Sequence, residues 1–290
     1  VQRKLMTTGK DENVFNIAVK GNFDDCQNLV KSMFSDKEFS NQINMSGVNS
    51  INWARIIAQS VYYFYCYFLA EDDNQPINFS VPTGNFGDVY AGYLAKKLGL
   101  PINKLIVATN QNDILHRAIS KGKYEAEHVS ETISPSMDIQ IASNFERLIY
   151  DLNSHDSSQT LDDMKNIKQN GKYSIDDEKL KKINQDFLSA RMSEQETLDV
   201  IKNIYEKFNM VLDPHTAIGY GAFDKHDLKG NNIVLATAHP CKFPDAILKA
   251  INLKSDLPNE LKFILDEKEN YGIIENNLKE IKQYILGKIK

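Results

Sequence analysis

The sequence contains little cysteine and no recognisable metal-binding pattern. Its three cysteines, Cys26, Cys66 and Cys241, lie far apart and form no C-x-x-C pair, which argues against a disulfide framework or a zinc site. The six histidines form neither H-x-x-x-H nor H-x-x-E-H spacing, so the sequence offers no support for metal catalysis. We therefore expect reduced, mostly buried thiols.

Long apolar runs and blocks of one charge are also missing. The most apolar segment, residues 56–70, is interrupted by Gln59, Ser60 and several tyrosines, and it falls short of the roughly 20 apolar residues that cross a membrane. The first residues, VQRKL, lack the apolar run of a signal peptide. With 34 basic and 39 acidic residues the net charge is −5, so nucleic-acid binding is not expected. These absences favour a soluble, cytoplasmic protein without membrane contact.

The composition is that of a globular protein, and its first half predicts strands and helices. Hydrophobic residues make up 42% of the 290, enough for a sizeable core. Residues 13–19 predict a short strand, and the turn at 21–25 leads into a helix through Phe34. Asn49 or Ser50 is placed to cap a long helix from Ile51 towards Leu69, whose nearly all-round apolar character predicts burial on most sides.

Strands and helices alternate between residues 77 and 120. We expect a strand at 77–81, a turn at TGNFG, a helix at 88–98 that ends at Gly99, a strand at 104–109 and a helix at 113–120. This order is typical of a parallel sheet with helices on both faces. The fold class predicted is α/β, with a doubly wound parallel sheet.

The second half of the chain is more polar. Residues 151–191 predict a partly helical surface excursion with little chemistry. A capping-box pattern at SEQE opens an amphipathic helix from Ser193 to Phe208. A last strand is expected at 232–237 and a helix near 244–251, and the tail at 258–290 predicts a solvated helical cover.

The turn TGNFG at residues 83–87 carries the strongest local signal for chemistry. Its glycines let backbone N–H groups converge, and the helix that follows presents its positive end, so a phosphate would fit there. Taken alone, Gly-x-x-Gly spacing is more often an ordinary tight turn. The turn is neither a Walker A loop nor a G-x-G-x-x-G dinucleotide fingerprint.

Several longer motifs resemble those of one enzyme family. They are PTGNFGD at 82–88 followed by AGYLAKKLGLPINKLIVATNQNDIL, SPSMDI and SNFERL within 134–148, DPHTAIGYGAF at 213–223, and ATAHPCKFPDAI at 236–247. Upstream, VQRKLMTT, GNFDDCQ and NSINWARIIAQ follow the expected order. Together they resemble the threonine synthases of fungi and bacteria over nearly the whole chain, apart from the polar segment after Asp151.

The resemblance implies a pyridoxal-phosphate enzyme of the tryptophan synthase β-subunit fold, which converts O-phosphohomoserine and water to L-threonine and phosphate. Carried over by motif, the residues that would hold the cofactor phosphate are Gly84, Asn85, Phe86 and Gly87, with Asp88 at the helix start. A carboxylate repels phosphate, so a helix-capping or water-mediated role is expected for Asp88. Thr237 would place its hydroxyl opposite the pyridine nitrogen. Without the surrounding motif, the strand propensity of threonine would be the more common explanation for this residue.

The substrate phosphate requires cationic or amide donors. The matching motifs offer four candidates: Asn112, Asn144, Arg147 and Lys242. A solvated helix-start lysine and an intrahelical ion pair are the commoner explanations for Lys242 and Arg147. His215 and His239 could carry protons, but histidine beside proline at an element end more often satisfies backbone carbonyls.

The family's Schiff-base lysine has no counterpart in this sequence. The family carries it in an N-terminal segment within Phe-Lys-Asp, whereas only Phe223-Asp224-Lys225 has that composition here. We favour a missing N-terminal segment of the same protein as its source, because the retained motifs are intact. On this view the chain alone is inactive, residues 1–44 close a smaller lobe, residues 45–290 form the larger cofactor-binding lobe, and the active cleft lies between them.

Three alternatives stay open. The first is a catalytically inactive threonine-synthase-like protein that binds pyridoxal phosphate or another phosphate ligand. The second is another lyase of the same fold, such as a serine or threonine dehydratase, or a sulfhydrylase, which SPSMDI, SNFERL and TAHP disfavour. The third is an interaction module without enzyme activity.

Overall fold

The computed structural model describes residues 2–21, 23–49, 52–70 and 75–289. It divides into two compact units, one formed by Val1–Gly47 with Asp256–Lys290 and the other by Val48–Ser255. The division into lobes at residues 44 and 45 stays a prediction. Contacts join the tail to the first 47 residues because β1 (Ile17–Lys20) pairs in parallel with β8 (Gly272–Glu275).

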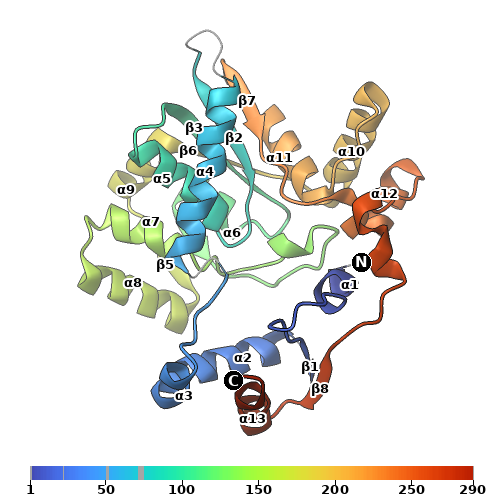
Figure 1. The fold of residues 1–290 in the computed structure, drawn as a ribbon. Helices are drawn as coiled ribbons and strands as arrows, with labels where there is room; N and C mark the ends of the chain where they lie inside the picture. The colour runs from blue at the N-terminus through green and yellow to red at the C-terminus, as the bar shows by residue number, and fades with distance from the viewer. Residues whose placement is uncertain (1, 22, 50–51, 71–74, 290) are drawn as a thin grey trace. The chain divides into compact units, whose positions relative to one another are not determined.

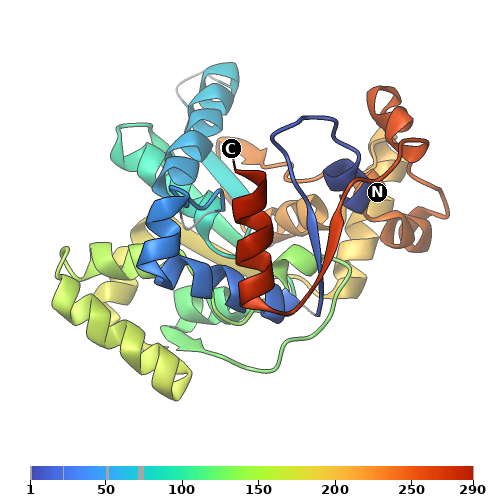
Figure 2. The same ribbon diagram turned by 60° about the horizontal axis from the view of Figure 1, so that its bottom comes forward.

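The smaller unit is a two-stranded sheet with helices packed on it (Figure 2). Besides β1 and β8 it contains α1 (Gln2–Thr7), α2 (Phe23–Ser35), α3 (Lys37–Gln42), the short helix η3 (Asn259–Leu265) and α13 (Leu278–Lys288). Its core consists of Leu29, Met33, Phe39 and Ile281. The tail therefore contributes a strand and a buried isoleucine, not only the helical cover expected from its sequence.

The larger unit is built on a parallel four-stranded sheet in the order β6-β3-β2-β7 (Figure 1). The strands are β2 (Ile77–Pro82), β3 (Ile102–Thr109), β6 (Phe187–Arg191) and β7 (Asn231–Val234). Every neighbouring pair runs parallel. The predicted α/β class with a parallel sheet is confirmed.

Helices cover both faces of this sheet because alternate residues of a strand point to opposite sides. Leu105 and Val107 pack in the cluster that also contains residues of α4 (Trp53–Ala70) and α5 (Gly87–Lys97). Ile106 and Ala108 pack instead with Ile218 and Ala222 of α11 (Pro214–Asp224). The arrangement is doubly wound, as the alternating pattern predicted.

The larger unit also contains further helices and a separate antiparallel pair of short strands. They are α6 (Ile114–Lys121), β4 (Lys123–Glu125), η1 (Pro135–Met137), α7 (Phe145–Leu152), α8 (Ser157–Asn170), β5 (Lys172–Ser174), α9 (Asp177–Asp186), α10 (Glu194–Phe208), η2 (Pro240–Lys242) and α12 (Pro244–Ile251). The capping box at Ser193 and Glu196 is present at the start of α10. No helix among the described residues is long and apolar enough to cross a membrane.

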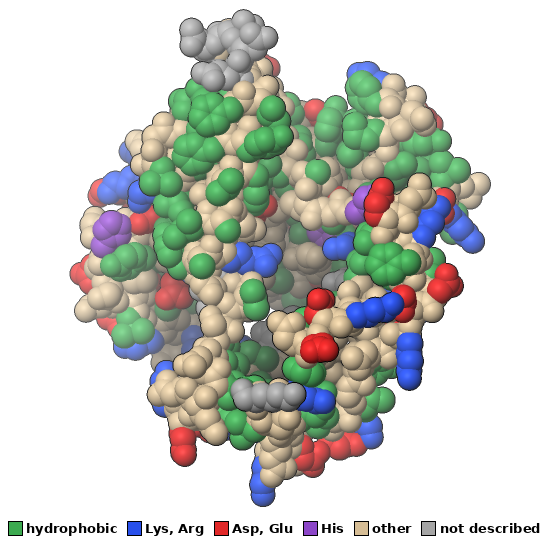
Figure 3. Space-filling view, viewed as in Figure 1, with side chains coloured by type: hydrophobic (Ala, Val, Ile, Leu, Met, Phe, Trp, Pro, Cys, Tyr) green, Lys and Arg blue, Asp and Glu red, His purple; other side chains and the backbone are tan. Residues whose placement is uncertain are grey.

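Helix α4 differs from its prediction in two respects. It begins at Trp53, where the Asn52 side chain accepts the N–H of Ala54 at 3.0 Å; of the two expected caps, Ser50 lies outside the described residues. The prediction that α4 is buried on most sides is wrong. Its buried residues are Ile56, Ser60 and Tyr63, on one face only. An apolar stripe stays exposed, seen over α4 in Figure 3: Trp53, Ile57, Val61, Tyr65, Phe68 and Leu69.

The prediction of a surface excursion at residues 151–191 is wrong for the last five of these residues. Phe187 to Arg191 form β6, which pairs with β3 and buries Phe187 and Ala190. The strand is short and contains Ser189 and Arg191, so it lacks the apolar run by which buried strands are usually found.

Candidate functional site

The turn between β2 and α5 depends on one close approach and one left-handed residue. A Cβ on Gly84 would lie 2.4 Å from the carbonyl oxygen of Ser136, so no side chain fits there. Phe86, just before α5, has a φ of 67°, a conformation that favours glycine. Its buried ring packs on Phe145 and Phe187 at centroid distances of 5.2 and 5.8 Å. This packing holds the strained backbone in place.

The start of α5 offers backbone donors to a ligand. The first amides of a helix have no acceptor within the helix, and Phe86 carries no polar side-chain atom that could cap them. The positive end of the helix therefore favours an anion here. A pocket of about 340 Å³ opens at this turn and is lined by Asn49, Arg55, Gln59, Pro82, Thr83, Gly84, Asn85, Phe86, Gly87, Asp88 and Ser136.

Asp88 is tied to α4. Its carboxylate accepts hydrogen bonds from the hydroxyls of Tyr62 and Tyr63, and the Tyr63 hydroxyl also donates to the Asp88 carbonyl at 2.9 Å. Burial raises the pKa of Asp88, against the effect of the two hydroxyls. Burial, and then the Asp88 charge, raises the pKa of both tyrosines, so both remain donors. The capping or water-mediated role expected of Asp88 stays a prediction beside this link between α4 and α5.

Arg55 and Gln59 line the same pocket and were not found from the sequence. They lie four residues apart on α4, hence on one face of the helix. Arg55 donates to the Val48 carbonyl at 3.3 Å and is the cation among the pocket's described lining residues. The i, i+4 spacing was a visible signal, but the sequence did not show that this face meets the glycine turn.

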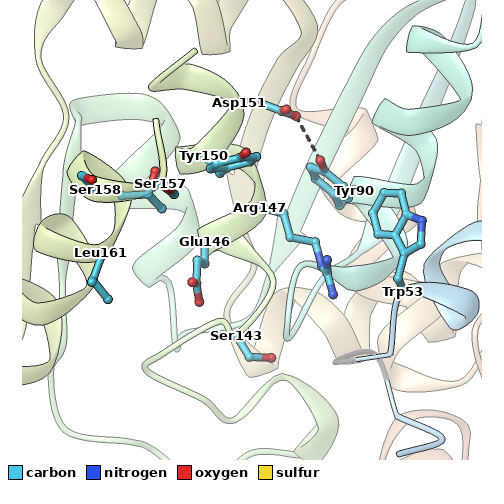
Figure 4. A pocket seen from close by; sticks show the side chains of 11 residues that line it. Trp53, Tyr90, Ser143, Glu146, Arg147, Tyr150, Asp151, Ser157, Ser158 and Leu161 are labelled. Carbon is cyan, nitrogen blue, oxygen red and sulfur yellow. Dashed lines mark hydrogen bonds between the residues drawn. The ribbon is translucent and has the colours of Figure 1, made fainter. Parts of the chain in front are cut away.

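Asn144 contacts the turn, whereas Arg147 lies at a second cavity. The N–H and side-chain amide of Asn144 both donate to the Asn85 carbonyl, at 3.1 and 3.2 Å. Arg147 donates to the Asn144 side chain at 2.9 Å and lies over the ring of Trp53. The cavity there, about 830 Å³, shares no lining residue with the glycine-turn pocket among the residues that the structure describes. Figure 4 shows Arg147 in this cavity.

The other two phosphate candidates lie apart from the pocket lining. Asn112 is buried. Its side-chain amide donates to the Ser130 carbonyl at 2.8 Å and to the Asp138 carboxylate at 3.0 Å. An amide so committed is better suited to holding its own loop than to binding a ligand. Lys242 is exposed at the end of η2.

Thr237 follows β7, beyond the strand itself, and is exposed. Its N–H donates to the Thr216 hydroxyl at 3.3 Å. His239 Nδ1 accepts the N–H of Cys241 at 3.2 Å, and His215 Nε2 accepts the N–H of Ser136 at 3.3 Å. Both histidines thus satisfy backbone N–H groups, where carbonyls had been expected.

Comparison with known proteins agrees with this arrangement. The family model "Threonine synthase, C-terminal" matches residues 216–285. Threonine synthase from Pseudomonas aeruginosa is 42% identical over 98% of this chain, which covers 61% of that protein. The Saccharomyces cerevisiae enzyme is 45% identical over 95% of the chain and 59% of its own length. The structure of pyridoxal-phosphate-bound threonine synthase from Brucella melitensis superposes with a TM-score of 0.94 at 44% identity, covering 99% of this chain and 62% of the other.

The fold is therefore that of the pyridoxal-phosphate-dependent enzymes of the tryptophan synthase β type. Within that class, the resemblance to threonine synthases is confirmed over nearly the whole chain. The chain spans about three fifths of the length of these relatives.

Proposed function

We propose that this chain is the cofactor-binding part of a cytoplasmic threonine synthase, which converts O-phosphohomoserine and water to L-threonine and phosphate. The observation that carries the proposal is the glycine turn at the start of α5, within a chain 44% identical to a pyridoxal-phosphate-bound threonine synthase. The turn presents uncapped helix amides to a pocket, the arrangement that binds phosphate groups.

Pyridoxal phosphate would fit this pocket with its phosphate against the amides of Gly87 and Asp88. When bound, the cofactor supplies an electron sink for the substrate carbon atoms. The absence of a side chain on Gly84 allows Ser136 to close one wall of the site. Arg55 adds a positive charge at the pocket, which would attract the cofactor phosphate or the substrate phosphate. The exposed Thr237 hydroxyl would face the ring nitrogen as a neutral partner.

A lysine would have to reach the cofactor from elsewhere. The described residues that line the pocket include no lysine, and the relatives are longer than this chain. We propose that the lysine belongs to another segment of the same protein. O-phosphohomoserine would then react only when that segment is present.

Cofactor binding can be tested on the 290-residue chain by fluorescence titration with pyridoxal phosphate. Gly84→Ala should weaken binding at least about tenfold, because its new methyl group would displace Ser136. Gly287→Ala in α13, where an added Cβ meets nothing within 4 Å, is the matched control and should bind normally. Pyridoxal without phosphate should bind far more weakly than pyridoxal phosphate. Equal binding by both variants would contradict the assignment of the site.

The reaction itself separates the alternatives. The complete gene product containing these residues should release inorganic phosphate from O-phosphohomoserine. A serine or threonine dehydratase would instead produce ammonia from its amino acid and release no phosphate. Cofactor binding without either activity would favour the inactive ligand-binding alternative.

A further inference from the structure

A hydrogen-bond network with a buried centre runs from Ser136, in the wall of the glycine-turn pocket, to the backbone of Thr237. The N–H of Ser136 donates to His215 Nε2 at 3.3 Å, and His215 Nδ1 lies 2.9 Å from an Asp213 carboxylate oxygen. The other Asp213 oxygen accepts from the Thr216 hydroxyl. The Thr216 oxygen in turn accepts the N–H of Thr237 at 3.3 Å.

The donors in this network determine where its protons lie. A backbone N–H can only donate, so His215 Nε2 accepts from Ser136 and carries no proton. A neutral imidazole then has its proton on Nδ1, where it donates to Asp213. The Thr216 hydroxyl has one proton, which it gives to Asp213, and this leaves its lone pairs for Thr237. Each link therefore has a single direction.

Burial makes the network costly to disturb. Asp213, His215 and Thr216 are 1%, 4% and 5% exposed, and the ring of Phe243 lies 4.8 Å from that of His215. Asp213 also caps α11 by accepting the N–H groups of His215 and Thr216. An unsatisfied buried polar group is unfavourable, so the loss of one side chain removes a hydrogen bond from each neighbour in the network.

We infer that Asp213, His215 and Thr216 are positioning residues that set the distance between the two ends of the cofactor site. Ser136, whose carbonyl closes against Gly84, belongs to the phosphate end. Thr237 belongs to the end proposed to face the ring nitrogen. One rigid network fixes both, so the cofactor would be held at a set tilt. The inference rests on the proposed function for the identity of the ligand, but the network itself needs no ligand.

The ligand-free test uses two substitutions at one position. Thr216→Val keeps the branched shape but removes the hydroxyl, whereas Thr216→Ser keeps the hydroxyl. Hydrogen exchange at the Thr237 amide, followed by NMR, should quicken about tenfold in Thr216→Val and stay near wild type in Thr216→Ser, as expected for the loss of one partly buried hydrogen bond. In the wild-type protein, the ¹⁵N shifts of His215 should report a neutral ring with its proton on Nδ1.

The ligand test measures the absorption spectrum and affinity of bound pyridoxal phosphate. Thr216→Val and His215→Gln should shift the spectrum and weaken binding about tenfold, and Thr216→Ser should restore both. His116→Gln is the control, because His116 is a partly buried histidine on α6 that contacts Ser189, outside the network.

The outcomes distinguish the two proposals. If the wild-type protein fails to bind pyridoxal phosphate, that result counts against the proposed function. The Thr237 exchange rates and the His215 tautomer still show whether the hydrogen-bond network exists. Unchanged Thr237 exchange in Thr216→Val, or a His215 ring protonated on Nε2, overturns the inference. If Thr216→Val does not fold, the tautomer of His215 in the wild-type protein decides whether the inference stands or is overturned. Normal binding with an unshifted spectrum in both variants also overturns the inference.

Discussion

Phe86 combines a buried ring with a backbone conformation that favours glycine, and this combination makes a sharp prediction. Replacing the ring by a methyl group in Phe86→Ala should cost about 3–5 kcal/mol of unfolding free energy, the range for buried phenylalanines, because Phe86 is 1% exposed. That is a large share of the roughly 5–15 kcal/mol that stabilises a typical domain.

The comparison with Phe86→Gly isolates the backbone. Glycine loses one more buried carbon, about 0.8 kcal/mol, but relieves about 1–2 kcal/mol of left-handed strain. Phe187 is equally buried, at 1%, yet its φ is −111°, so glycine there brings only losses. We expect the change in unfolding free energy from the alanine variant to the glycine variant to be about 1–2 kcal/mol more favourable at position 86 than at position 187.

Urea unfolding can measure this difference through the fluorescence of the protein's single tryptophan. Trp53 lies in α4 of the larger unit, the same unit as both phenylalanines. The four variants should unfold with similar slopes, so that their midpoints compare stabilities directly. Alanine-to-glycine steps of equal size at the two positions would refute the claim that packing holds Phe86 in a strained conformation.

Three other changes test separate parts of the larger unit. Burial raises the Asp88 pKa above its ordinary 3.8, so the stability that this carboxyl contributes below pH 3.8 is lost as pH rises through its folded pKa. Asp88→Asn should therefore gain stability relative to wild type as pH rises above 3.8. A difference independent of pH would contradict this. Lys225 and the cap lower the Glu196 pKa to about 2, so its contribution is present above pH 4.5 and lost towards pH 2; Glu196→Gln should cost roughly 1 kcal/mol at pH 7 and little near pH 2. Gly219→Ala, whose Cβ would lie 3.0 Å from Val234, should cost about 1–3 kcal/mol in urea unfolding, unlike the α13 glycine control.

Local patterns predicted much of the central sheet. The run at 77–81, the glycine turn and the helix after it each have a strong local signal, and all three are present at β2 and α5. Helix α4 was harder because an apolar sequence shows that a helix can be buried, not that something covers it. Strand β6 was missed because pairing with β3 stabilises it, not its own composition.

The candidate site was predictable only where it is continuous in sequence. Gly84 to Asp88 are neighbours in the chain, so their shared position at a helix start followed from the pattern. Arg55, Gln59 and Ser136 reach the same pocket from distant segments, and only the tertiary fold brings them there. The role expected of Asn112 at the substrate phosphate stays a prediction; in the structure its side-chain amide donates to Ser130 and Asp138.

The pairing of β1 with β8 has a consequence for biosynthesis. Lys20 and Glu275 are 255 residues apart, so β1 leaves the ribosome long before its partner exists. At about 5–20 residues per second, the delay is roughly 10–50 s. During that interval the apolar side chains of α2 have no α13 to cover them. The apolar face of α2 that packs on Ile281 therefore stays open to chaperones until α13 has been synthesised.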